Sequence, residues 1–174
     1  KAEGVPEDVR GVVAKLRAAR FEAFLVGGVV RDLLLGNDVS VLKDYDVATS
    51  ALPKDVQRLF RRTAPPGIQH GTITVLAGSY VIEVTTYRKD GTYTDGRRPD
   101  AVEFTDSIHE DLLRRDFAMN ALALDPATDE LIDDHGGVDD IRARRIRAVG
   151  DPARRFSEDG LRVMRACRFS SQLD

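Results

Sequence analysis

The stretch that decides the fold is Phe24–Asp32, which reads FLVGGVVRD, together with Lys43–Asp46, which reads KDYD. The apolar run before the glycines predicts a buried strand, and the amphipathic residues after them predict a short helix. Backbone N–H groups at the start of a helix can receive a phosphate group. Asp44 and Asp46, spaced i, i+2, point to one face of an extended strand. Two such carboxylates suit a small, hard cation such as Mg²⁺.

Each half of this pattern has a simpler explanation when it is taken alone. A pair of glycines before a helix is a weak signal for phosphate binding, and an Asp-x-Asp sequence is often only a polar strand end or turn. The two halves together, at this spacing, favour chemistry on a nucleoside triphosphate.

Length and composition limit the class of protein. A chain of 174 residues is expected to form one domain, or one domain and the start of another. It opens on Lys1 and closes within a predicted helix that has no stop signal, so we expect a piece of a longer chain. The chain has no apolar run of about 18 residues, so the sequence predicts no membrane span. The N-terminus has no signal-peptide pattern. A single cysteine, Cys167, favours a reducing, cytoplasmic location, and with three histidines it does not suggest a structural zinc site.

Positive charge is concentrated near the C-terminus, although the net charge of the chain is -3. From Arg142 to Arg168 there are nine arginines, no lysine and three acids. This pattern is compatible with a solvated helix face. Arginine used to the exclusion of lysine also favours forked recognition of phosphates or base edges.

Periodicity and turn signals predict the order of the elements. The acidic residue Glu83 falls within an otherwise apolar predicted strand, where it lies either on an exposed sheet face or beside Asp44 and Asp46 as a third carboxylate. A polar, glycine-rich loop at Lys89–Pro99 is expected at the mouth of the site. The remaining predictions are a helix from Pro6, strands at Phe21–Val26 and Asp44–Ala48, a helix from Pro53, a loop at Pro65–Gly67, a hairpin of Thr72–Ala77 and Tyr80–Arg88, a strand at Ala101–Thr105, a helix over Glu110–Leu122, paired strands at Leu131–Asp133 and Arg145–Val149 with Gly136-Gly137 turning between them, and a helix from Ser157.

The final predicted helix carries a polar ridge with a period of three residues, formed by Asp159, Arg162, Arg165 and Arg168. A carboxylate and a guanidinium one turn apart can read a nucleobase together. The same spacing also produces ion pairs on a wet helix face, worth about 0.2–0.5 kcal/mol each, and spacing alone favours this simpler interpretation.

Four motifs, in order, resemble those of the class II tRNA nucleotidyltransferases, the bacterial CCA-adding enzymes and their poly(A) polymerase relatives. The resemblance covers nearly all of the chain, from about Phe21 to Leu173. The motifs are LVGGVVRD at 25–32 with KDYD at 43–46, EVTTYR at 83–88, RRDF at 114–117 through Asn120-Ala121, and RFSEDGLR at 155–162.

The resemblance implies an α/β (α+β) fold. We expect a polymerase-β-like nucleotidyltransferase head over residues 1–150, with a small mixed sheet and helices on one side. Residues 151–174 would start a helical neck, because Asp151-Pro152 breaks the chain between the two parts.

The resemblance also implies the site residues. Asp44 and Asp46 would bind Mg²⁺, two ions being expected, with Glu83 as the third carboxylate. Asp159 and Arg162 would select cytosine or adenine without a nucleic-acid template, and Arg165 and Arg168 would complete the nucleotide site. The nucleotide-binding residues expected nearer the N-terminus are Gly27, Gly28, Arg31, Arg115, Asp116 and Asn120.

The implied activity is the addition of CMP or AMP, from CTP or ATP, to the 3′ end of tRNA or another RNA. CC-adding, A-adding and poly(A)-making enzymes share these motifs, but the Lys89–Pro99 loop looks full length, which argues against a CC-only enzyme. A second hypothesis is that this chain only binds Mg-NTP, because the RNA-gripping part of the family is missing. The sequence departs from the family pattern in a longer Gly36–Lys43 loop, in Leu42 for a common proline, and in Gly160 for alanine, which costs about 1 kcal/mol of helix propensity.

Overall fold

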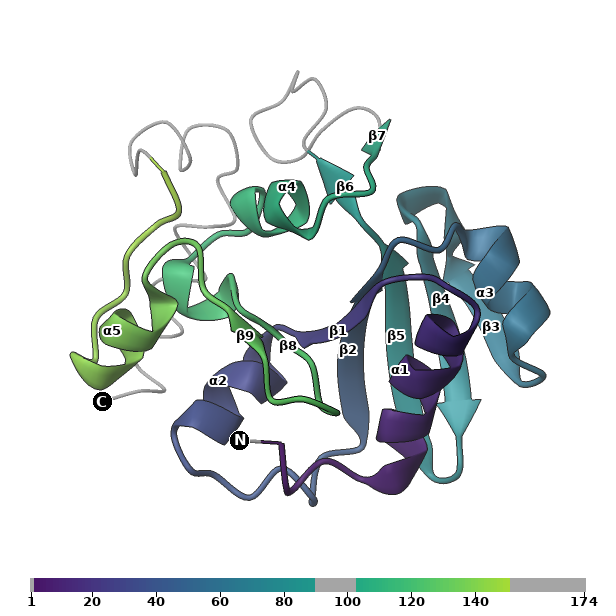
Figure 1. Ribbon diagram of the computed structural model, residues 1–174, viewed down its shortest axis with the longest axis horizontal. Coiled ribbons are helices and arrows are strands. Elements are labelled where there is room, and N and C mark those ends of the chain that lie inside the picture. The colour runs from purple at the N-terminus through teal and green to yellow at the C-terminus, as the bar shows by residue number, and fades with distance from the viewer. Residues whose placement is uncertain (1, 90–102, 151–174) are drawn as a thin grey trace.

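The computed structural model describes residues 2–89 and 103–150. Within them, a mixed seven-stranded sheet has the strand order β3-β4-β5-β2-β1-β8-β9, and β6 and β7 form a separate pair (Figure 1). The expected fold class is confirmed. The strands are β1 Ala23–Val26, β2 Asp44–Thr49, β3 Thr63–Gly67, β4 Thr72–Ala77, β5 Tyr80–Thr86, β6 Arg88–Lys89, β7 Glu103–Phe104, β8 Ala123–Leu124 and β9 Leu131–Ile132. The helices are α1 Glu7–Ala18, α2 Gly28–Leu34, α3 Pro53–Leu59, α4 Ile108–Leu113 and α5 Gly137–Arg142, with 3-10 turns η1 Ile68–His70 and η2 Ala118–Asn120.

The predicted unit of strand, glycines and helix is confirmed. All four residues of β1 are buried, as expected for an apolar strand inside the sheet. Gly27 then takes a φ of 79° and a ψ of -150°, and α2 begins at Gly28. This backbone conformation is open to glycine and strained for other residues, so the glycine allows the strand to turn directly into the helix.

Strand β2 lies at the centre of the sheet. It pairs antiparallel with β1 and parallel with β5, and β5 forms the predicted hairpin with β4. Gly78, at the turn of that hairpin, has a φ of 59°. The parallel pairing joins segments that are far apart in the sequence.

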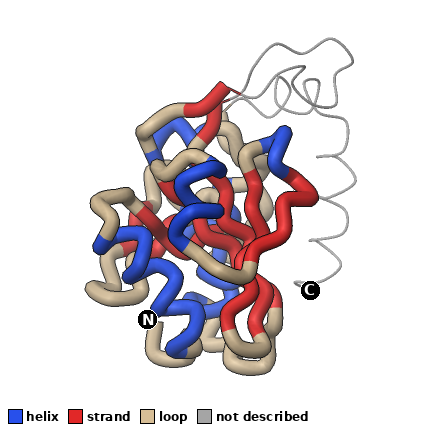
Figure 2. The backbone as a smooth tube through the Cα atoms, turned by 90° about the vertical axis from the view of Figure 1, so that its right-hand side faces the viewer, coloured by secondary structure: helices blue, strands red, loops and turns tan. Residues whose placement is uncertain are grey.

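Helices cover both faces of the sheet. On one face, Val9, Val12, Val13 and Leu16 of α1 and Val56 of α3 pack with Leu25, Val47, Ile82 and Val84. On the other face, Ile108 and Leu112 of α4 pack with Phe24, Val26 and Ala48. Figure 2 shows helices lying over the strands of the sheet. The expectation of helices on one side is therefore wrong for α4. Its apolar residues pack against the side chains of β1 and β2 that point away from α1 and α3.

The expected loop at Pro65–Gly67 is instead part of β3. This strand lies at the edge of the sheet and pairs only with β4, with an irregular register between Ala64 and Gly67. Proline lacks a backbone N–H donor but is tolerated on an edge strand, where one side of the ladder needs no donor.

The predicted helix over Glu110–Leu122 is interrupted. It ends as α4 at Leu113, and Phe117 is extended, with a φ of -123° and a ψ of 147°. Phe117 forms a bridge with Ala148, and the Asp116 carboxylate accepts a hydrogen bond from the Phe117 backbone N–H at 2.8 Å. The bridge to Ala148, a residue far away in the sequence, replaces the hydrogen bonds of a continued helix. Periodicity within the helix sequence cannot predict such a partner.

The predicted pairing of Leu131–Asp133 with Arg145–Val149 is also wrong. Strand β9 pairs with β8 instead, and Gly137 begins α5 rather than lying in a turn. The Asp133 carboxylate accepts hydrogen bonds from the backbone N–H groups of Gly137 and Val138, at 2.6 and 3.0 Å, and so caps that helix. No helix in residues 2–89 or 103–150 is long and apolar enough to cross a membrane.

Candidate active site

Three predicted carboxylates lie on one face of the sheet. Asp46 is directly opposite Glu83 in the parallel pairing, and Asp44 is opposite Val81. Because directly paired residues and residues two apart on a strand share a face, all three acids project from the face that α4 packs against. Asp44 and Asp46 are exposed, and Glu83 is half-buried.

Tyr45, between the two aspartates, explains how their strand is held. Its ring is buried on the opposite face, and its hydroxyl donates a hydrogen bond to the Val39 carbonyl at 2.6 Å. A buried aromatic anchor therefore turns both neighbouring carboxylates outward.

The charges around Asp46 oppose one another. Desolvation by the surrounding protein raises the pKa of this carboxyl even though the residue is solvent-accessible, and the charges of Glu83 and Asp44 raise it further. The guanidinium of Arg115 lowers it. The arrangement disfavours negative charge at Asp46 and would be relieved by a bound cation.

The three acids do not form a ready-made metal cluster. Across the described residues, no three His, Cys, Asp or Glu side chains are arranged to hold an ion. Glu83 Oε1 instead accepts a hydrogen bond from Thr74 Oγ1, at 3.0 Å, on the neighbouring strand β4. Asp46 and Glu83 are neighbours on adjacent strands, as predicted. The Glu83 side chain is hydrogen-bonded to Thr74 of β4, however, and its role as a metal ligand stays a prediction.

The two glycines lie beside these acids. A Cβ atom on Gly27 would lie 3.4 Å from Asp46 Oδ2, and one on Gly28 would lie 3.4 Å from Arg31 Nη2. The backbone therefore runs close to both groups at the start of α2. The absence of side chains at these two glycines leaves the space beside Asp46 and Arg31 open.

Arg31 and Asn120, both predicted to bind nucleotide, contact each other. Arg31 Nη1 donates a hydrogen bond to Asn120 Oδ1 at 3.2 Å. Asn120 is buried on η2, and the Arg31 side chain is 14% exposed. The amide orients the guanidinium, and Arg31 Nε also lies 3.6 Å from Asp32 Oδ1.

Arg115 is held by Asp111, which the sequence analysis missed. Arg115 Nη2 lies 3.0 Å from Asp111 Oδ2, and Arg114 Nε lies 3.2 Å from Asp111 Oδ1. The Arg88 backbone N–H also donates to Asp111 Oδ1, at 3.0 Å. The signal that could have revealed this carboxylate is an acid placed three and four residues before two arginines on a helix.

The charges of this cluster remain at neutral pH. Burial of Asp111 would raise the pKa of its carboxyl, but the charges of Arg114 and Arg115 and its hydrogen bonds hold the pKa below its ordinary value. Burial lowers the pKa of Arg114 to about 10, against the opposing effect of Asp111. Two arginines on one carboxylate leave net positive charge in the cluster, and the charge of Arg115 acts on Asp46.

Asp116 is buried and serves the turn after α4 through its bond to Phe117, and its carbonyl accepts a hydrogen bond from the Val149 backbone N–H. Its expected role in nucleotide binding stays a prediction.

Three predicted features lie outside the described residues. They are the polar ridge of Asp159, Arg162, Arg165 and Arg168, the expected neck, and nearly all of the Lys89–Pro99 loop.

Comparisons with known proteins agree with this geometry. The profile of the Poly A polymerase head domain matches residues 23–147. A CCA-adding enzyme of Enterococcus faecalis is 52% identical over 163 residues, which cover 94% of this chain and 39% of that protein. A CCA-adding enzyme of Levilactobacillus brevis is 49% identical over 175 residues, 99% of this chain and 43% of that protein.

Solved structures show the same likeness. The Bacillus stearothermophilus CCA-adding enzyme in complex with CTP superposes with a TM-score of 0.83 at 44% identity, covering 94% of this chain and 38% of that one. The Thermotoga maritima CCA-adding enzyme complexed with tRNA-CCA has a TM-score of 0.71 at 26% identity, covering 96% and 38%. The chain spans about two fifths of the length of the curated relatives it matches.

Proposed function

This chain belongs to the family of the Poly A polymerase head domain, and from that premise we propose that it is the head of a template-independent RNA nucleotidyltransferase. The whole protein would add CMP and AMP, from CTP and ATP, to the 3′ end of tRNA. The relatives named CCA-adding enzymes, and the solved relatives holding CTP or tRNA, support this proposal. The observation that carries it is the parallel register that sets Asp46 opposite Glu83, beside Gly27.

The donor set fits a hard divalent cation. Nucleotidyltransferases of this family use divalent metal ions, and we propose Mg²⁺, in two sites, held by Asp44 and Asp46 with Glu83 joining them. Exposed carboxylate oxygens on one rigid strand are the ligands that Mg²⁺ prefers. When bound, the ions would supply a lowered pKa for the attacking hydroxyl and charge stabilisation for the leaving phosphates.

The remaining head residues would bind and orient the triphosphate. The backbone at Gly27 and Gly28 leaves room for phosphate oxygens, and Arg31 and Arg115 would balance the charge that develops on them. Asn120 would orient Arg31, while Asp116 would shape the turn that follows Arg115.

In the proposed reaction, the 3′-hydroxyl oxygen of the RNA forms a bond to the α-phosphorus of CTP or ATP. The bond to the bridging oxygen of the β-phosphate breaks, the hydroxyl proton is released, and pyrophosphate leaves. Asp159 and Arg162 would select the base, and Arg165 and Arg168 would complete the nucleotide site.

We propose a cytoplasmic location for the protein, because a single cysteine is typical of proteins in a reducing compartment.

The test uses a chimaera in which this chain replaces the matching head of the Enterococcus faecalis enzyme. We expect addition to tRNA that lacks CCA, and loss of addition in Asp44→Ala with retention in Glu103→Gln, an exposed acid of β7. Addition by a folded Asp44→Ala chimaera would reject the metal-ligand role. Transcripts ending before C, after CC, or complete would separate CCA-adding, A-adding, CC-adding and poly(A)-making activities.

A second candidate function is binding of Mg-NTP without catalysis. The small share of the relatives' length that this chain covers favours it for the chain alone. Calorimetric titration with Mg-CTP, beside an addition assay on the 174-residue chain, separates the two: binding without addition supports the second function, and addition supports the first.

A further inference from the structure

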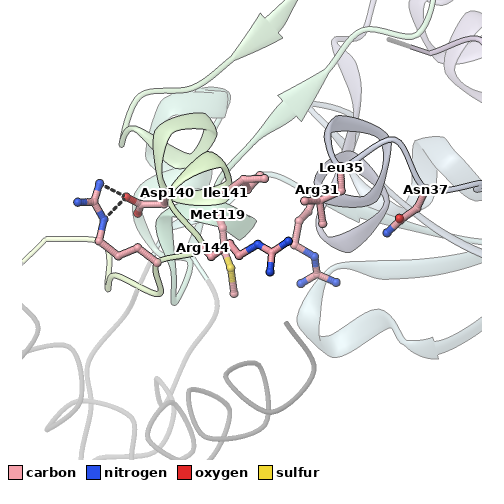
Figure 3. A pocket seen from close by; sticks show the side chains of 8 residues that line it. Arg31, Leu35, Asn37, Met119, Asp140, Ile141 and Arg144 are labelled. Atoms are coloured by element: carbon pink, nitrogen blue, oxygen red, sulfur yellow. Dashed lines mark hydrogen bonds and ion pairs between the residues drawn. The ribbon is translucent and has the colours of Figure 1, made fainter. Parts of the chain in front are cut away.

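A cavity of about 220 Å³ lies between α2 and α5 (Figure 3), and its lining in the described residues does not include Asp44, Asp46 or Glu83. Arg31 and Leu35 line it from the α2 side, and Ile141, Arg144 and Arg145 line it from α5 and the turn after it. Leu35 is seven residues after Gly28, which corresponds to about 10 Å along a helix. Within the described part of the chain, Arg31 is the one residue that the cavity shares with the proposed triphosphate site.

Positive charge exceeds negative charge around the cavity. Among the described residues, three guanidinium groups, of Arg31, Arg144 and Arg145, line it with one carboxylate, that of Asp140. Outside the lining, Asp32 Oδ1 lies 3.6 Å from Arg31 Nε. Asp140 is fully buried and already accepts from Arg145 Nε at 2.9 Å and from Arg147 Nε at 3.1 Å. The acid of the cavity is thus neutralised by two arginines, and Arg144 has no acidic partner among the described residues.

The backbone places Arg144 in this position at a cost. Arg144 has a φ of 51°, in the left-handed region, just after α5 ends. Glycine is the residue that helix ends favour in this conformation. In Figure 3 the Arg144 side chain extends toward Arg31, so that two like charges approach each other in one cavity.

We propose that this cavity binds a phosphate group, as a second anion site beside the triphosphate site. Paired guanidinium groups match the geometry and charge of phosphate oxygens, and a bound phosphate would offset the repulsion between Arg31 and Arg144. The phosphate belongs either to the RNA backbone or to pyrophosphate, a choice of source that rests on the proposed function. The chemistry of the site does not depend on that choice.

The experiment compares Arg144→Gly with the intact 174-residue chain. Glycine removes the guanidinium and suits the left-handed backbone, so the variant is expected to fold, and Arg144→Gln is a second removal of the same charge. Arg142→Gln is the matched control, because Arg142 is exposed on α5 and does not line the cavity. The probes are inorganic pyrophosphate by calorimetry and a short fluorescent RNA ending in CC by anisotropy, both without divalent ions.

We expect each Arg144 variant to bind one probe or both at least about tenfold more weakly, the scale of losing one charge-assisted hydrogen bond. If the probe is the RNA, the salt dependence of binding should also fall by about one unit of slope. Loss for pyrophosphate alone assigns the site to pyrophosphate, loss for RNA alone assigns it to the RNA backbone, and loss for both shows a phosphate site that accepts either source. Unchanged binding of both, or an equal loss in Arg142→Gln, would overturn the proposal.

Mg-CTP binding by the Asp44→Ala and Arg144→Gly variants tests the proposed function independently of the cavity. Mg-CTP binding that is lost in Asp44→Ala but kept in Arg144→Gly supports a metal site at β2 whatever the cavity does. Mg-CTP binding kept in Asp44→Ala counts against the proposed metal ligand and leaves the cavity result standing.

Discussion

The buried carboxylate of Asp111 holds the guanidinium of Arg115, with 3.0 Å between Oδ2 and Nη2. The same carboxylate binds Arg114 and the Arg88 backbone, so it joins α4 to the start of β6. Arg115 acts electrostatically on Asp46. One acid on a helix therefore connects the packing of the second face of the sheet to the charge balance of the candidate active site.

Asp111→Asn should destabilise the fold and weaken triphosphate binding together. The variant keeps one oxygen acceptor but leaves two largely buried arginines without their counter-charge, and we expect a loss of about 3 kcal/mol in the free energy of unfolding. Urea unfolding and calorimetric titration with Mg-CTP measure the two effects. Glu110→Gln, at the exposed neighbouring position, should change neither. Equal effects in both variants would show that the loss does not come from the Asp111 cluster.

Stability should fall in acid through Asp111. Its folded pKa lies below its ordinary value, so its contribution is fully present above the unfolded pKa of about 3.9. The contribution is lost as the pH falls through the lower, folded value. Thermal unfolding between neutral pH and about pH 3 should therefore show a smaller acid-induced drop in Tm for Asp111→Asn than for the unchanged chain. Parallel curves would assign the acid sensitivity to other carboxylates.

Metal binding should weaken in mild acid because the folded pKa of Asp46 is raised. A proton competes with the cation for this carboxylate at a higher pH than for an ordinary aspartate. Mg²⁺ titration as a function of pH should therefore show affinity decreasing as the pH falls toward that raised value. Asp46→Asn should bind Mg²⁺ weakly with little dependence on pH. A steep profile that persists in Asp46→Asn would assign the proton to another group.

Gly27→Ala should lower stability and also impair the site. The φ of 79° with a ψ of -150° is strained for alanine, at a cost of about 1–3 kcal/mol, and the added methyl group would contact Asp46 Oδ2. Gly11→Ala is the matched control, because a Cβ at Gly11 in α1 meets nothing within 4 Å. The control should stabilise the protein by about 0.5–1 kcal/mol. A Gly27→Ala variant as stable as the unchanged chain would show that the turn into α2 tolerates a side chain.

Local patterns predicted the elements that depend on short-range order. The predicted helix from Pro6 is present as α1, and the apolar run before Gly27 is a buried strand. The predicted apolar strand around Glu83 is present as β5, in which Ile82 and Val84 are fully buried on either side of it. Predictions failed where a distant partner replaced local hydrogen bonds, as at Phe117 and in β9.

The sequence by itself determined which residues are available for chemistry: two aspartates two apart on a strand, glycines at the start of a helix, and arginines near an acid. Only the tertiary structure decided which of them meet. The parallel pairing of β2 with β5 sets Asp46 against Glu83, the bond from Thr74 turns Glu83 toward β4, and the packing of α4 brings Asp111 and Arg115 to the same face. Side-chain periodicity records the face on which a residue lies, whereas strand order and helix docking arise from burying apolar surface between segments far apart in the chain.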